Sequence, residues 1–108
     1  MTKQYLIGID VGTGSARAGI FDTAGTMVSS AVQPIKMWKP KPDFVEQSSD
    51  DIWQSVSIAV KKAIKQGGIS PGSIKGIGFD ATCSLVVLDH QNKPLPVTPG
   101  EPANQNII

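Results

Sequence analysis

The residues best suited to chemistry lie near the start of the chain, in the sequence DVGTGSAR at positions 10–17. Glycines let a backbone come close to a phosphate group and turn N–H groups toward it. Hydroxyl side chains add donors, and an arginine adds a charge-assisted contact. We therefore predict a phosphate-binding site, with these candidate contacts: Gly12, Thr13, Gly14, Ser15 and Arg17.

The carboxylate that opens this sequence needs a different role, because it would repel a phosphate directly. Magnesium prefers oxygen ligands and keeps several of its waters. We predict that Asp10 holds Mg²⁺ through water, so that the metal neutralises charge on a transferring phosphoryl group. The alternative is a plain hairpin turn, since such turns also favour glycine. The position of Asp10 after an apolar strand, together with Arg17, favours the phosphate site.

The glycine-rich sequence is neither a Walker loop nor a dinucleotide-binding fingerprint. Both of those place a helix directly after the glycines. Here the residues that follow, at positions 16–22, have the composition of a β-strand.

The elements that must position these residues indicate an α/β fold with a mixed sheet. Short apolar runs separated by turn signals predict an antiparallel meander of three strands. A connecting loop, a crossover helix, two further strands and a turn follow, and the helix would make the fourth strand parallel to an earlier one. In chain order the expected ranges are strands 5–10, 16–22 and 26–33, loop 34–47, helix 49–66, strands 74–79 and 85–89, and turn 90–93.

The helix is predicted from apolar residues that recur at spacings of three and four. Ser48 or Ser49 can cap its start, where Asp50 and Asp51 suit the positive end of the helix dipole. Gly67 can supply a left-handed stop. After residue 94 the prolines are frequent and no core pattern is visible. The expected buried face consists of Ile52, Val56, Ala59, Val60, Ala63 and Ile64.

Composition excludes several classes of function. The chain has 108 residues, 40% of them apolar, and a formal net charge of +1. This balance gives no electrostatic case for nucleic acid or an acidic membrane surface as a partner. The N-terminus leads straight into a strand candidate, so we expect no signal peptide. The single cysteine cannot form an internal disulfide, and we expect a cytoplasmic protein.

Three motifs in order resemble a known family. DVGTGSAR resembles the first phosphate motif of the actin, hexokinase and Hsp70 superfamily. EQSSDDIW at positions 46–53 and GFDATCSLVVLD at 78–89 narrow the resemblance to the N-terminal domain of FGGY carbohydrate kinases, in the D-ribulokinase-like branch. The resemblance covers nearly the whole chain.

The resemblance implies a ribonuclease-H-like domain, of which residues 1–108 would be an incomplete N-terminal portion. Such kinases have two domains around a cleft and transfer the γ-phosphate of ATP to a sugar hydroxyl, here D-ribulose or a related pentulose. The aspartate that serves as their general base and the adenosine pocket lie further along the family's sequence. We therefore assign no catalytic residue to this chain and expect it to be inactive alone.

By position, the resemblance also assigns a sugar-side loop, with Thr82, Cys83 and Ser84 as contacts. Hydroxyls and backbone amides suit a ligand rich in hydroxyl groups. The alternative is a tight turn in which Asp80 and Thr82 satisfy their own backbone. Cys83 is not expected to be a nucleophile, because the only histidine, His90, lies in a predicted turn; a small buried or pocket-lining cysteine is favoured.

Two tryptophans could stack on sugars, but packing is the favoured role for both, Trp53 on the helix and Trp38 in the connecting loop. Two other functions stay open for the whole protein. One is a non-catalytic regulator that binds sugar or nucleotide, and the other is a structural actin-like module. The sequence leaves homo-oligomerisation open.

Overall fold

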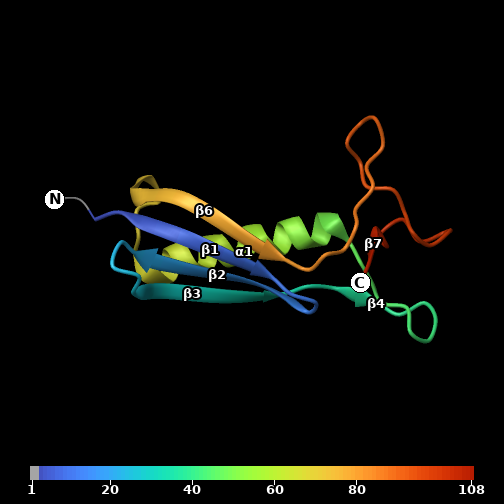
Figure 1. Cartoon of the computed structure of the whole chain (residues 1–108), viewed down its shortest axis with the longest axis horizontal. Helices are drawn as coiled ribbons and strands as arrows, with labels where there is room; N and C mark the ends of the chain where they lie inside the picture. Colours follow the sequence, from blue (N-terminus) through green and yellow to red (C-terminus); the bar gives the residue numbers. More distant parts are fainter. Residues whose placement is uncertain (1–2) are drawn as a thin grey trace.

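A four-stranded mixed sheet forms the body of the molecule (Figure 1), in a computed structural model that describes residues 3–108. The strand order is β3-β2-β1-β6. Strands β1 and β6 are parallel, and the other neighbouring pairs are antiparallel. The strands are β1 (Tyr5–Val11), β2 (Ser15–Asp22), β3 (Met27–Pro34) and β6 (Ile74–Ala81).

The predicted meander and the parallel fourth strand are confirmed. The second turn of the meander is fixed by Asp22, whose Oδ1 accepts hydrogen bonds from the amides of Ala24 and Thr26, both at 3.0 Å. Gly25 has φ of 86°, a conformation that favours glycine.

The single long helix, α1 (Ser49–Gly67), packs across β3 and β2 on one face of the sheet. The Oγ of Ser48 accepts a hydrogen bond from the amide of Asp51 at 3.1 Å and caps the helix. The stop is one residue later than predicted, because Gly68 takes the left-handed conformation, with φ of 61°. Gly67 is needed for packing instead: a Cβ there would lie 2.8 Å from Cδ1 of Ile69 and 2.9 Å from Cβ of Ser29.

The core lies between α1 and the sheet. Alternate residues of β1 face the helix, and Val56, Ala59 and Ala63 of the predicted helix face are buried against them, with Ile52, Val60 and Ile64 partly buried. The residues between them on β1, among them Leu6 and Asp10, are exposed on the opposite face of the sheet. That opposite face carries no other element within residues 3–108, so side chains on it are open to solvent. The core consists of Ile7, Ile9, Val11, Ala16, Ala18, Ile20, Ala31, Ile35, Val56, Ala59, Ala63 and Ile69.

A second, smaller sheet lies beyond the turn that joins β1 to β2 (Figure 1). The sequence predicted only irregular structure for its residues. It has the order β4-β5-β7, with β4 (Met37–Trp38), β5 (Glu46–Gln47) and β7 (Asn106–Ile107). Polar side chains fill its interior, since Glu46, Gln47 and residues 104–106 are all buried. Residues after 94 show no apolar periodicity, and hydrogen bonds between buried polar side chains hold them in place instead.

Two further predictions fail. Residues 85–89 form isolated bridges, Val86 to Asn106 and Leu88 to Pro94, and no strand. The side chain of Leu85 is 76% exposed, so no core side chains hold this segment in a sheet. Trp53 is 64% exposed and does not pack under the helix. The predicted turn after Asp89 is present, closed by a hydrogen bond of 2.8 Å from the Asp89 amide to the Lys93 carbonyl.

Trp38 is half-buried in β4. A short 3-10 helix at Pro71–Ser73 joins α1 to β6. Within residues 3–108 no helix is both long and apolar enough to cross a membrane.

Candidate functional site

Three charged side chains form one row across the sheet near the carboxyl ends of β1 and β6. Asp10 is the register partner of Arg17 on β2 and of Asp80 on β6. Neighbouring strands lie about 4.8 Å apart, so the three backbone positions are adjacent. The alternation along β1 places the row on the face opposite α1, in the open.

Asp10 and Arg17 form an ion pair at the surface. Nη1 of Arg17 lies 3.7 Å from Oδ2 of Asp10, and their side chains are 63% and 52% exposed. Such an exposed pair contributes little to stability. Both groups are therefore available to a ligand at small cost to the fold.

A second row, of glycines, runs beside the charged row. Gly8 is the register partner of Gly19 on β2 and of Gly78 on β6. The three missing side chains open a shallow hollow of about 460 Å³ on the sheet surface, which Asp10, Arg17 and Asp80 border with Phe21 and Phe79. The Phe21 ring reaches over Gly19, where an added Cβ would lie 3.0 Å from it, so a ligand in this hollow would meet apolar surface beside the charged row.

The predicted phosphate loop joins β1 to β2 directly beyond the charged row. The amide of Gly12 donates to the carbonyl of Ser15 at 2.9 Å and closes the turn. Neither Gly12 nor Gly14 has a positive φ. A Cβ at Gly12 would lie 3.6 Å from its nearest neighbour and one at Gly14 would lie 3.9 Å away, which are ordinary contacts. Within residues 3–108 neither position requires a glycine for its backbone conformation or its packing.

Two carbonyl groups of this loop are held from outside the hairpin. Nε2 of Gln47 donates to the Thr13 carbonyl at 2.7 Å, and the Ile35 amide donates to the Gly14 carbonyl at 3.0 Å. The N–H groups of Thr13 and Gly14 have no hydrogen-bond acceptor within residues 3–108. Hydrogen bonds to the Thr13 and Gly14 carbonyls thus hold the loop in place, while the N–H groups of the same two residues remain available to a ligand.

The predicted sugar-side loop begins where β6 ends, beside the phosphate loop. The amide of Thr82 donates to the Val11 carbonyl at 3.1 Å, which continues the parallel pairing past β6. Oγ1 of Thr82 and Oγ of Ser84 lie 3.5 Å apart. The structure thus brings the two predicted loops to one edge of the sheet, the edge where open α/β sheets bind ligands.

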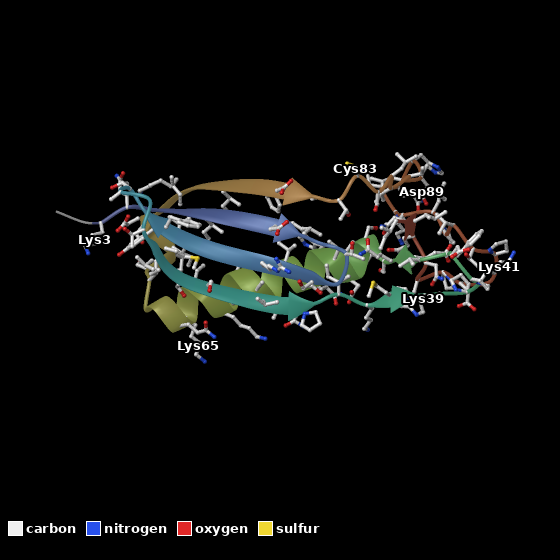
Figure 2. The ribbon with its side chains drawn as sticks, turned by 60° about the horizontal axis from the view of Figure 1, so that its bottom comes forward. Lys3, Lys39, Lys41, Lys65, Cys83 and Asp89 are labelled. Carbon is white, nitrogen blue, oxygen red and sulfur yellow. The ribbon has the colours of Figure 1, made fainter. Side chains whose placement is uncertain are left out.

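Cys83 is exposed, so a buried position for it is excluded. Figure 2 shows it at the end of the molecule that also carries Lys39, Lys41 and Asp89, opposite the end that carries Lys3 and Lys65. His90 is exposed in its turn, as predicted. Asp50 and Asp51 lie in the first turn of α1, as predicted.

Two residues of the site were missed in the sequence. Asp80 was considered only as a turn residue, yet it lies on β6 beside Asp10. A signal was present: Gly-Ile-Asp at positions 8–10 and Gly-Phe-Asp at 78–80 end two strands that were predicted to be parallel. The second missed residue is Gln47, which no local sequence pattern identifies.

The donor set suits magnesium bound together with a nucleotide. Residues 3–108 contain no cluster of three or more His, Cys, Asp or Glu side chains that could enclose a metal. Magnesium at phosphate-transfer sites is usually held by one or two carboxylates, with phosphates and waters as the other ligands. The adjacent carboxylates of Asp10 and Asp80 match that requirement.

Comparison with known proteins agrees with this geometry. Residues 5–98 match the model of the FGGY family of carbohydrate kinases, N-terminal domain. The chain is 48% identical over 106 residues to a human FGGY carbohydrate kinase domain-containing protein, with 98% of this chain and 19% of the relative covered. It is 45% identical over 107 residues to a D-ribulokinase of Saccharomyces cerevisiae, covering 97% and 15%. A glycerol kinase of Halothermothrix orenii is 39% identical over 97 residues, covering 90% and 19%.

Solved structures show the same fold at low identity. A gluconate kinase from Lactobacillus acidophilus superposes with a TM-score of 0.79 at 21% identity, over 99% of this chain and 20% of that one. A xylulose kinase from the same organism gives 0.77 at 22%, over 97% and 19%. The predicted α/β fold with a mixed sheet is therefore confirmed.

The chain spans about a fifth of the length of the relatives that it matches. The family model nevertheless matches most of it, in the region that contains the charged row, the phosphate loop and the sugar-side loop. The chain belongs to the FGGY family of carbohydrate kinases, within the N-terminal domain of that family.

Proposed function

We propose that the complete protein containing this chain transfers the γ-phosphoryl group of ATP to a hydroxyl of a pentulose, with D-ribulose as the first acceptor to test. FGGY family members are carbohydrate kinases. The observation that carries the proposal is the charged row of Asp10, Arg17 and Asp80 at the carboxyl edge of the sheet, directly beside a glycine loop with free amides.

Each part of the site has a role in such a transfer. Arg17, the hydroxyls of Thr13 and Ser15 and the free amides of Thr13 and Gly14 bind the β- and γ-phosphates, and Gly12 leaves room for them. Asp10 and Asp80 would hold Mg²⁺, which when bound neutralises charge on the transferring group. The hydroxyls of Thr82 and Ser84, with Cys83 between them, line the acceptor side. The proton acceptor for the sugar hydroxyl comes from another part of the protein.

The choice of acceptor is supported by likeness alone. One relative at 45% identity is named a D-ribulokinase. Glycerol kinases are also similar, and xylulose and gluconate kinases share the fold. All four named acceptors carry several hydroxyls, which fits a site built from Thr82 and Ser84.

The test is a panel of acceptors assayed with the complete protein, ATP and Mg²⁺, following ADP release. We expect the highest kcat/KM with D-ribulose, compared with D-xylulose, gluconate and glycerol. Preference for D-xylulose would keep a pentulose as acceptor but refute D-ribulose. Preference for gluconate or glycerol would refute the pentulose assignment and leave the kinase function standing. Release of ADP with none of a broader set of sugars and polyols would refute the kinase function.

Substitution of Gly14 by alanine in the complete protein tests the glycine loop. Because nothing in the chain crowds this position, the fold should be unchanged, and the added methyl should meet the phosphates. We expect KM for ATP to rise between about 10- and 100-fold, since small displacements at a reacting group have effects of this size. Steady-state kinetics at saturating acceptor measures it.

The matched control for this substitution is Gly72→Ala. Gly72 lies in the short 3-10 helix, its φ is not positive, and an added Cβ would meet only Oγ of Ser70 at 3.9 Å. It should leave KM for ATP unchanged. An unaltered KM in Gly14→Ala as well would show that the phosphates do not approach this turn.

A further inference from the structure

Gln47 is a buried side chain that reaches the phosphate loop from a distant part of the chain. It lies in β5, is fully shielded from solvent, and its Nε2 donates to the Thr13 carbonyl at 2.7 Å. Gln47 touches the loop through one backbone oxygen, so its effect on a ligand must pass through the loop backbone.

That contact fixes the direction of an amide. In a planar trans peptide, the carbonyl of one residue and the N–H of the next point in opposite directions, and no cis peptide bond occurs within residues 3–108. With the Thr13 carbonyl held toward Gln47, the Gly14 N–H must point away from it. Gly14 is exposed, and its N–H has no acceptor within residues 3–108.

Asn106 holds the Gln47 amide from the side opposite the loop. Nδ2 of Asn106 donates to Oε1 of Gln47 at 2.9 Å, and Asn106 is 1% exposed. The direction of these two hydrogen bonds follows from the loop, because a carbonyl can only accept. Gln47 must therefore present Nε2 to Thr13 and Oε1 to Asn106. Asn106 must then present Nδ2, and its buried Oδ1 has no partner within residues 3–108. The backbone of the loop thus dictates the direction of both buried amides.

Further buried hydrogen bonds hold this pair of residues in place. Thr98 donates to the carboxylate of Glu46, and Nδ2 of Asn104 donates to it at 2.8 Å. Oε1 of Gln105 accepts from Oγ of Ser48 at 2.9 Å. Hydrogen bonds between buried groups are stronger than those in water and restrict the residues that they join. Both amide atoms of Gln47 are hydrogen-bonded, so two partners fix its position even though Oδ1 of Asn106 has none within residues 3–108.

We propose that Gln47, braced by Asn106, is a positioning residue that aims the Gly14 N–H at the terminal phosphates of the nucleotide. The inference rests on the proposed function, because it assumes that the loop binds phosphate. When packed residues behind a site hold its backbone in place, the donors keep the geometry that phosphate binding requires.

The test compares nucleotide affinities of the complete protein by calorimetry, with ADP and adenosine as the probes. Gln47→Glu keeps the length and the acceptor for Asn106 but places a carboxylate oxygen against the Thr13 carbonyl. We expect affinity for ADP to fall roughly 10-fold, the equivalent of about one well-placed hydrogen bond. Affinity for adenosine and KM for the sugar should not change, whereas a general loss of structure would lower both nucleotide affinities and raise KM for the sugar.

The matched control is Gln54→Glu, the same change at an exposed position of α1. It should leave the ratio of ADP to adenosine affinity unaltered. Gln47→Met gives a second, uncharged variant that removes the donor, and we expect the same selective loss of ADP affinity.

A measurement on the unmodified protein needs no variant: hydrogen exchange at the Gly14 amide should slow when Mg²⁺ and ADP are added. Failure of the unmodified protein to bind ADP would refute the proposed function itself. Normal ADP binding with an unprotected Gly14 amide, or with an unchanged affinity ratio in folded Gln47 variants, would overturn the positioning role alone.

Discussion

Replacement of Asp10 by asparagine in the complete protein is expected to lower kcat by at least about 100-fold, the usual effect of removing one electrostatic group from a transfer site. Asparagine keeps the size of the side chain but removes the charge that would hold Mg²⁺. The fold should persist, because Asp10 is 52% exposed and its pair with Arg17 spans 3.7 Å at the surface. Steady-state kinetics and a thermal melt measure the two effects.

Asp43→Asn is the matched control for this prediction. Asp43 lies in the exposed loop before β5 with φ of 66°, a conformation that asparagine also tolerates. Its kcat and melting temperature should equal those of the unmodified protein. If Asp10→Asn retained normal kcat at limiting Mg²⁺, the metal role of Asp10 would be refuted, and Asp80 would remain as the candidate ligand.

The second large effect is on stability. Ile20→Ala is expected to lower the free energy of unfolding by about 2–5 kcal/mol, a large part of the roughly 5–15 kcal/mol typical of folded proteins. Ile20 is 0% exposed and is the largest fully buried apolar side chain among residues 3–108. Removing three carbons there leaves a cavity between the sheet and α1. Urea unfolding of the complete protein measures this change, in the unfolding transition that includes this domain.

Ile58→Ala makes the same change on the outer side of α1, where the side chain is 40% exposed. It should cost less than about 1 kcal/mol, as surface substitutions usually do. Equal losses from Ile20 and Ile58 would contradict the position of the core.

The sequence predicts the main sheet and α1 well because their signals are local. Alternating burial in residues 5–33 and the spacing of Val56, Ala59 and Ala63 each arise within one element. The small sheet could not be predicted in this way. The contact of Gln47 with Asn106 joins residues 59 positions apart in the chain through side-chain amides, and such pairs leave no periodic trace.

The same distinction between local and long-range signals applies to the candidate site. Asp10, Arg17 and the glycines between them were recognisable because one short segment contains them all. Asp80 lies 70 positions after Asp10, and it joins the row only through the register of two parallel strands. The strand prediction for residues 85–89 was wrong for a different reason. Their composition favours a strand, but no neighbouring strand pairs with them along their length.

The link from Asn106 through Gln47 to Thr13 has a consequence for how variants of this protein should be interpreted. A substitution of Asn106 would act on the phosphate loop through Gln47, and residues 104–106 belong to none of the three motifs at positions 10–17, 46–53 and 78–89. It could still appear in a genetic screen as a loss of catalysis with normal protein abundance. Mutational maps of the family should therefore show a second intolerant stretch, far along the chain from the glycines whose geometry it maintains.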